Sequence, residues 1–427
     1  MRDFLRIYLG VIVIAGASLA FAWRFVGSPP PSEIRFATGV DGGFYAALGE
    51  RFRAEIEREG VRVVLVPSAG SVENLASLER AEGGVDVAFV QGGIGDASRD
   101  RDVVALGSLA LEPLWIFVRR ELAFDRLDAL VGRRVAVGGL GSGTRALVMD
   151  LLAAAGVASQ VDTLDIAGAE AERALLAGEV DVLFAVTAPQ TALVRRLLLA
   201  PGIELVTLRR AEALTRRFAF LTTVRIPAGT LDLAADLPPR DVTLVATATN
   251  LLARADLHPA IGSLLLQVAG AVSPGDRLLG TLGAFPSARH VDHPLSAEAR
   301  RHFERGPTAL RRYLPFWLAN LVERLWVLLI PVVAVLIPLL RIAPPTFRWQ
   351  VRRRIYRWYR EVREVECEGE AARDPTVVDA CIARLDALQH DVGQLHVPLA
   401  YADGLYHLRL HIRFVRERLD ARRAATR

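Results

Sequence analysis

The chain has 427 residues, which is enough for two or three domains that each bury a core. Hydrophobic residues make up 52 %, a high share for a wholly soluble protein, and this indicates membrane segments. The net charge is +4, and the basic excess is concentrated after residue 340, so nucleic acid is not an expected partner. The two cysteines, Cys367 and Cys381, lack the spacing of metal ligands, which favours reduced structural thiols.

Residues 1–26 predict an N-terminal membrane anchor or a signal peptide. Arg2 and Arg6 precede an uncharged apolar run from Ile7 to Trp23, at the short end for a membrane-spanning helix. Residues 20–22 (AFA) match a signal-peptidase site, whereas the length of the run and the following Trp23 favour an uncleaved anchor. Both alternatives place the next residues outside the cytoplasm.

Between residues 32 and 306, short β-rich segments alternate with helical ones, which predicts an α/β fold with parallel sheets. The predicted strands are Ile34–Ala37, Val61–Val66, Val85–Val90, Leu114–Arg119, Val135–Val137, Thr163–Ile166, Val180–Val186, Ile203–Val206, Phe218–Val224 and Thr243–Asn250. The predicted helices are Phe44–Arg58, Val72–Arg80, Thr144–Ala155, Glu170–Leu176, Gln190–Leu199 and Pro259–Ala271. We expect two lobes, one of about 32–115 plus 218–306 and one of about 116–217, with a hinged cleft between them.

Three strand–turn–helix units carry glycine and hydroxyl residues in their turns. These turns are centred on Thr38–Gly43, Ser68–Ser71 and Gly138–Thr144, and Arg145 adds a charge beside the last one. The first amides of a helix have no partner within the helix and face the positive end of its dipole, so such turns favour anions. Strand ends in α/β sheets converge. The three turns therefore predict one anion site.

Residues 314–341 predict a transmembrane helix, because a long apolar segment is followed at once by arginines. The positive-inside rule then places the tail, 347–427, in the cytoplasm, where its apolar spacing predicts a helical hairpin. Asp374 and Pro375 are predicted to cap and start one of its helices. The tail also contains four histidines, which no acidic residue accompanies at metalloprotease spacing, so no metal is expected. These histidines are His390, His396, His407 and His411.

The order of several motifs resembles the TAXI family, the solute-binding subunits of tripartite (TRAP) secondary transporters. The motifs are TGVDGGFYAALG, SAGSVENLASLE, VDVAFVQ, LEPLWIFVRR, GRRVAVGGLGSGTR, IPAGTLD and VTLVATATNLLARADL, within about residues 34–285. The resemblance implies a two-lobed periplasmic binding protein, type II-like, with no cofactor and no enzymatic activity. Its implied partners are a small organic anion and the membrane permease subunits, and the anchored form adds the lipid bilayer of a bacterial inner membrane.

By position, the resemblance implies a set of ligand-binding residues on several turns. They are Thr38, Gly42, Gly43, Tyr45, Gly70, Ser71, Asn74, Gln91, Ser142, Gly143, Thr144, Arg145, Thr187 and Gln190. Some of them have structural alternatives: Ser71 and Asn74 as helix caps, Tyr45 as a core aromatic, and Gly42 and Gly43 as positions of positive φ.

Three other functions compete with solute capture for transport. A membrane-tethered sensor that signals through the tail is the main alternative. A dinucleotide-binding enzyme would use residues 141–146, which fit G-x-G-x-x-A, together with Asp162 or Asp165. An exported hydrolase is disfavoured because His258, His290 and His293 form no recognisable triad with a serine.

Overall fold

The structure is a computed structural model that describes residues 29–96, 98–273, 284–306, 356–372, 374–395 and 402–426, with scattered single positions elsewhere. The chain divides into two compact units, Ser28–Leu321 and a second one made of Met1–Gly27 with Val322–Arg427. The first unit is α/β and contains one sheet of ten strands, in the order β2-β1-β3-β10-β4-β7-β5-β6, with β9 on β10 and β8 on β4. The α/β class predicted from the sequence is confirmed.

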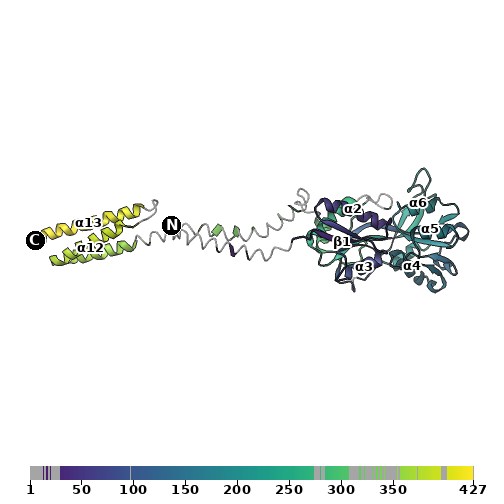
Figure 1. Cartoon of the computed structure of the whole chain (residues 1–427), viewed down its shortest axis with the longest axis horizontal. Helices are drawn as coiled ribbons and strands as arrows, with labels where there is room; N and C mark the ends of the chain where they lie inside the picture. Colours follow the sequence, from purple (N-terminus) through teal and green to yellow (C-terminus); the bar gives the residue numbers. More distant parts are fainter. Residues whose placement is uncertain are drawn as a thin grey trace. The chain divides into compact units, whose positions relative to one another are not determined.

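The first half of the sheet contains parallel strands β1 (Glu33–Ala37), β2 (Arg62–Val66) and β3 (Val87–Gln91). Helices α2 (Phe44–Arg58) and α3 (Ser71–Glu79) lie on opposite sides of β1 in Figure 1. Helix α8 (Pro259–Val272) packs beside α2, and α9 (Ala297–Arg305) packs on α8. The core between α2 and the sheet is aromatic: the rings of Phe36 and Phe89 are 4.6 Å apart, and Phe52 meets both edge-on.

The second half of the sheet contains β5 (Arg134–Ala136), β6 (Asp162–Leu164), β7 (Val182–Val186) and β8 (Ile203–Leu205). Around it lie the helices α4 (Gly143–Ala154), α5 (Gly168–Leu176), α6 (Ala192–Leu199) and α7 (Ala211–Arg217), with short 3₁₀ turns at Arg120–Leu122, Leu127–Leu130 and Ala158–Gln160. Helix α4 forms because Leu147, Val148, Leu151 and Leu152 make one apolar face, which is fully buried. Strands β5, β6 and β7 are parallel, as predicted.

Two long strands connect the halves and correct the expectation of parallel sheets. Strand β4 (Val103–Arg119) pairs with β10 (Val242–Arg254) over its first part and with β7 and β8 over its last part, in each case antiparallel. Strand β9 (Thr222–Ile226) is also antiparallel to β10. Within these strands the sequence predicts Leu114–Arg119, the last part of β4, and Thr243–Asn250, most of β10. Gly107, Ser108 and Glu112 interrupt the apolar pattern of β4.

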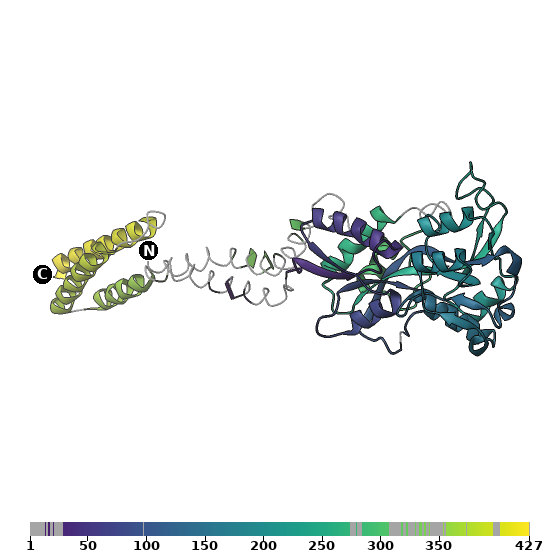
Figure 2. The ribbon, with the colours of Figure 1, turned by 45° about the vertical axis from the view of Figure 1, so that its right-hand side comes forward.

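The second unit contains the helical segment 356–371, α12 (Pro375–Gly393) and α13 (Ala402–Thr426). Helices α12 and α13 lie side by side in both views (Figure 1, Figure 2). Their shared core includes Leu385, Leu408 and Ile412, with Val362 from the preceding helical segment. Asp374 caps α12 by accepting a hydrogen bond from the Thr376 amide at 2.9 Å, ahead of Pro375 at the first helical position, as predicted.

Among the residues that the structure describes, no helix combines the length and the apolar character that a membrane span requires. The predicted anchor or signal at 1–26 and the predicted transmembrane helix at 314–341 lie almost entirely outside the described residues.

Candidate functional site

The first glycine turn, between β1 and α2, is tied down mainly by backbone contacts. The Thr38 amide donates to the Val66 carbonyl at 3.0 Å, and the Thr38 side chain is buried. Gly43 is the residue that caps α2, and its amide donates to the Val40 carbonyl at 3.0 Å. A Cβ at Gly43 would lie 2.9 Å from that oxygen, so a side chain does not fit. Gly42 is exposed and has a φ of +73°, which only glycine adopts freely.

The second turn leads into α3 and carries a buried polar network. The Asn74 amide group donates to the carbonyl oxygens of Thr38 and Phe89, while its Oδ1 accepts from Ser68 at 2.5 Å. Ser71 accepts a hydrogen bond from the Gln91 amide at 2.9 Å. The residue that caps α3 is Gly70, so Ser71 and Asn74 are not helix caps. They fix the turn against the ends of β1 and β3.

The third turn, in the second half of the sheet, leads into α4. Ser142 caps this helix by accepting a hydrogen bond from the Arg145 amide at 3.2 Å. The Thr144 hydroxyl accepts from the Val186 amide at 3.2 Å and so joins the turn to the end of β7. The Arg145 side chain donates to Asp165 at 2.6 Å, so its charge is already partly balanced within the protein.

The turns of the two halves meet directly. The Gly141 carbonyl accepts hydrogen bonds from the amides of Val72 and Glu73, at 3.1 and 3.4 Å, and thereby occupies the first turn of α3. The Gln91 side chain donates to the Gly143 carbonyl at 3.2 Å. A Cβ at Gly143 would lie 2.6 Å from Gln91 Oε1 and 3.0 Å from Ser71 Oγ, which explains why this position holds glycine.

The same closeness is seen at Gly70, where a Cβ would lie 3.1 Å from Ser142 Cα and where φ is +132°. Contacts across the two halves therefore connect Gly70, Ser71 and Gln91 with Ser142 and Gly143. These five predicted site residues come together in the described structure. An anion at the first turn of α3 would have to displace the Gly141 carbonyl.

Tyr45 and Glu112 add a buried carboxyl group to this cluster. The Tyr45 hydroxyl donates to Glu112 Oε1 at 2.9 Å, and the Thr249 hydroxyl donates to the same oxygen. Tyr45 also contacts the Ser71 hydroxyl, which places the carboxyl group beside α3. Thr249 lies opposite Gln91 in the pairing of β10 with β3. Glu112 and Thr249 thus belong to the cluster although they lie on the two connecting strands.

Burial strongly affects the protonation of this pair. Removal from water raises the pKa of Glu112 to about 7, against the opposing effect of the Thr249 and Tyr45 hydroxyl groups. Burial, followed by the nearby Glu112 charge, raises the pKa of the Tyr45 hydroxyl well above its usual range. Glu112 can therefore change its charge near neutral pH, whereas Tyr45 keeps its proton.

Sequence reasoning missed Glu112 and Thr249 although both lie within motifs quoted for the resemblance. Glu112 is a single carboxylate in a strand whose neighbours are nearly all apolar and buried, a pattern that itself marks a special site. Thr249 belongs to the alternating threonines of VTLVATATN, which place hydroxyl groups on one side of a buried strand.

Two further predicted residues, Thr187 and Gln190, follow β7 and differ in their contacts. The Thr187 carbonyl accepts from the Trp115 indole at 3.0 Å, and its amide faces the Pro113 carbonyl at 3.4 Å, so its backbone joins β7 to β4. Gln190 is exposed on the turn before α6. Neither contact set links these residues to the Tyr45–Glu112 cluster.

The residues that an enzyme would use as a dinucleotide-binding protein or a hydrolase make structural contacts. Asp165 pairs with Arg145, His258 caps α8 through its Nδ1, and His293 lies 3.1 Å from the buried Asp100. Within the described ranges, no group of three or more His, Cys, Asp or Glu side chains is arranged to hold a metal ion.

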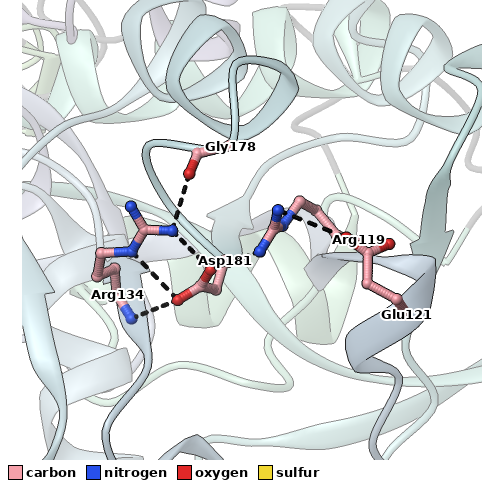
Figure 3. Close-up of polar contacts among 5 residues, drawn as sticks. All are labelled: Arg119, Glu121, Arg134, Gly178 and Asp181. Carbon is pink, nitrogen blue, oxygen red and sulfur yellow. Dashed lines mark hydrogen bonds and ion pairs between the residues drawn. The ribbon is translucent and has the colours of Figure 1, made fainter.

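A second buried carboxylate, Asp181, lies directly before β7, the neighbour of β4 in the sheet. Figure 3 shows it between Arg119 and Arg134, whose guanidinium groups approach it to 2.9 and 2.8 Å. Hydrogen bonds from Arg134 hold the pKa of the Asp181 carboxyl below its usual range. Asp181 precedes β7, whereas the turns of the candidate site follow their strands, so this ion-pair cluster lies at the strand ends opposite those turns.

The comparisons with known proteins identify the family. A model described as the NMT1-like family matches residues 36–266, more than half of the chain. The chain belongs to the NMT1-like family. The match spans every turn of the candidate site and both connecting strands. No curated protein matches the chain.

Several solved structures resemble the chain of this NMT1-like protein at low identity. A protein from Bordetella bronchiseptica RB50 has 16 % identity and a TM-score of 0.43, over 65 % of this chain and 98 % of that one. The alkanesulfonate-binding protein SsuA from Xanthomonas axonopodis pv. citri, bound to MOPS, has 18 % identity and a TM-score of 0.39, over 57 % and 74 %. SsuA from Escherichia coli, a periplasmic aliphatic sulphonate-binding protein, has 16 % identity and a TM-score of 0.36, over 73 % and 84 %. All three TM-scores lie below 0.5.

Proposed function

We propose that this chain is a non-enzymatic solute-binding protein that captures a small organic anion, a carboxylate or an amino acid, between the two halves of its sheet. The observation that carries the proposal is the meeting of the α3 and α4 turns at the Gln91–Gly143 hydrogen bond, with Ser142 and Thr144 at the start of α4. Two bodies that meet through backbone groups and hydroxyls can close on an anion and bind it without a dedicated counter-charge. The NMT1-like match over 36–266 spans this arrangement.

In this proposal the ligand-binding groups come from all of the predicted turns. Ser142, Gly143 and Thr144 present the first-turn amides of α4, and Arg145 adds long-range attraction. The first half contributes Tyr45, Ser71 and Gln91 directly, while Thr38, Gly42, Gly43, Gly70 and Asn74 shape the turns. Thr187 and Gln190 would contact the ligand from the end of β7, although no contact in the described structure links them to the Tyr45–Glu112 cluster.

The test is thermal unfolding of the full chain with and without millimolar carboxylates and amino acids, since a ligand that binds only the folded state raises its stability. We expect stabilisation by at least one compound, and loss of most of it in Ser142→Ala and Thr144→Ala. Ser296→Ala is the matched control, because Ser296 caps α9 in the same way, accepting from the Ala299 amide at 3.0 Å. Equal loss of ligand response in Ser142→Ala and Ser296→Ala would contradict the assignment.

We further propose that the chain is a TAXI-type subunit that is anchored in the inner membrane and delivers its anion to TRAP permease subunits. This rests on the order of the motifs and on the apolar segments 1–26 and 314–341. The binding unit would then lie in the periplasm and the tail in the cytoplasm. Copurification of a permease with the chain from gently solubilised membranes tests the partner. A reporter that is active only in the cytoplasm, fused after residue 427, tests the location of the tail.

A further inference from the structure

Glu112 is a buried carboxylate that lacks a cationic partner. Its residue is 3 % exposed, and both donors to Oε1 are neutral hydroxyl groups, from Tyr45 and Thr249. Oε2 accepts no hydrogen bond from any residue that the structure describes. Ionised groups are seldom buried without an opposite charge, because their lost hydration must be replaced. The setting of Glu112 among the described residues therefore leaves one carboxyl oxygen without a donor and, whenever the group is ionised, a negative charge without a partner.

The other buried carboxylates of the described chain all have basic partners. Glu172 accepts two hydrogen bonds from Arg196 at 2.7 Å each, and Asp181 pairs with Arg119 and Arg134. Asp100 lies 3.1 Å from the His293 imidazole. The same chain thus pairs a buried carboxylate with a basic side chain where its role is structural, which sets Glu112 apart.

Glu112 also belongs to the polar cluster that contains the turns of the proposed site. It is opposite Thr247 in the pairing of β4 with β10, close to the end of β3 that carries Gln91. Through Tyr45 it is connected to Ser71, which faces Gly143 across the junction between the halves. Two side chains, Tyr45 and Ser71, thus connect Glu112 with the start of α4.

We propose that Glu112 binds the ammonium group of the ligand, so that the ligand class of this site is a zwitterionic amino acid rather than a simple carboxylate. The inference rests on the proposed function, because the ligand's carboxylate is assigned to the start of α4. The ammonium group supplies the opposite charge that Glu112 lacks, and its N–H groups supply donors for Oε2. A carboxylate without an amino group would place a second negative charge near Glu112 and gain nothing from it.

The protonation of Glu112 provides a second quantity to measure, the proton released when the ligand binds. Among the described groups that contact Glu112, Tyr45 on α2 is titratable and Thr249 on β10 is not. Since Tyr45 stays protonated, a proton that leaves the site near neutral pH comes from Glu112. Binding of an ammonium group favours the ionised carboxylate, so amino-acid binding near pH 6.5 should release a proton to the buffer.

The experiment is isothermal titration of the full chain with three pairs of compounds that differ only in the amino group: L-alanine and propanoate, L-leucine and 4-methylpentanoate, L-glutamate and glutarate. We expect the amino acid of at least one pair to bind roughly 30-fold more tightly than its partner, the size of effect typical of a buried charge pair. Glu112→Gln keeps the shape and an acceptor for both hydroxyls, and should reduce that ratio to below about threefold. Glu172→Gln is the matched control and should keep it.

Three outcomes separate the inference from the proposed function. If both members of every binding pair bind equally to the unaltered chain, or if amino-acid binding releases no proton at pH 6.5, the ammonium assignment is wrong and carboxylate capture stands. If Glu112→Gln keeps the full ratio, another residue recognises the amino group. If no compound in the panel binds, the proposed function itself is contradicted. The comparison within pairs and the proton release need no variant, so a poorly folding Glu112→Gln chain would not prevent the test.

Discussion

Two buried carboxylates show how the same chemical group serves different purposes on neighbouring strands of one sheet. Asp181 lies at the start of β7 between Arg119 and Arg134, and its pKa is held below the usual range (Figure 3). Glu112 lies among the site turns with hydroxyl partners alone, and burial raises its pKa to about 7. The difference shows that burial alone does not define a functional carboxylate, because the partners decide which protonation state is stable.

The two carboxylates also differ in their position relative to the strands. Asp181 borders a strand, where arginines from the neighbouring strands β4 and β5 can reach it without being buried themselves. Glu112 lies inside a strand that is covered on both faces, so a long basic side chain would itself have to be buried. A ligand that arrives and leaves can supply such a charge without a permanent cost in stability.

The largest predicted effect concerns the pH dependence of stability. The folded state raises the pKa of Glu112 from 4.5 to about 7, so it binds the proton more tightly than the unfolded state does. The stability that this proton provides is complete below about pH 4.5 and is lost as the pH rises to 7, a change of about 3 kcal/mol. Urea unfolding of the unaltered chain and of Glu112→Gln at pH 5 and pH 8 measures it.

Relative to the unaltered chain, Glu112→Gln should therefore gain about 2.5 kcal/mol between pH 5 and pH 8, because part of the change lies below pH 5. Asp181→Asn is the control, because a lowered pKa keeps Asp181 ionised in both states over that range, and its difference from the unaltered chain should stay constant. That difference should shrink only at lower pH, as Asp181 becomes protonated in the folded state. Parallel profiles for all three chains would mean that Glu112 is not buried as described.

The second prediction concerns the strength of the paired carboxylate. At pH 7, Asp181→Asn should lower the free energy of unfolding by about 2 kcal/mol, less than for a fully buried pair because both arginines are partly exposed. Glu121→Gln is the matched control: Glu121 contacts the same Arg119 at 3.4 Å but is largely exposed, so its loss should cost less than about 0.5 kcal/mol. Similar costs in the two variants would remove the distinction between buried and exposed partners.

Much of the fold was predictable because local pattern and burial agree. Helix α2 begins and ends where the sequence predicts, at Phe44 and Arg58, and Ser142, which lies in the predicted third turn, caps α4. The full length of the connecting strand β4 was not predicted, because Glu112 and Ser108 interrupt its apolar run. Such residues are stable there only because partners far along the chain, such as Thr249 and the Ser287 carbonyl, satisfy them.

The candidate site was predictable in part for the same reason. Glycines and hydroxyls near helix starts are local signals, and they located Gly70, Ser71, Ser142 and Gly143. The contact of Tyr45 with Glu112 joins residues 67 positions apart and has no local signal. No sequence pattern predicts that the Gly141 carbonyl occupies the start of α3, because this contact depends on how the halves of the sheet meet.

The third prediction weakens the hydroxyl support of Glu112. Tyr45→Phe removes one of the two donors to Oε1, which should raise the pKa of Glu112 further and destabilise the ionised form. We expect a loss of about 1.5 kcal/mol at pH 8 and a smaller loss at pH 5, because hydrogen bonds to charged groups are the stronger ones. Thr249→Val should act in the same direction. A larger loss at pH 5 than at pH 8 would contradict the direction of the shift.

The smallest predicted effect concerns Arg145, whose formal charge first suggested an anion. Because its guanidinium already donates to Asp165 and about a third of each side chain is exposed, Arg145→Gln should change stability by less than about 0.5 kcal/mol. It should weaken carboxylate binding by less than about threefold, since only long-range attraction is lost. Asp165→Asn frees the same charge and should strengthen binding by a similar small factor. A loss of binding in Arg145→Gln as large as that in Ser142→Ala would instead mean that Arg145 leaves Asp165 and contacts the anion directly.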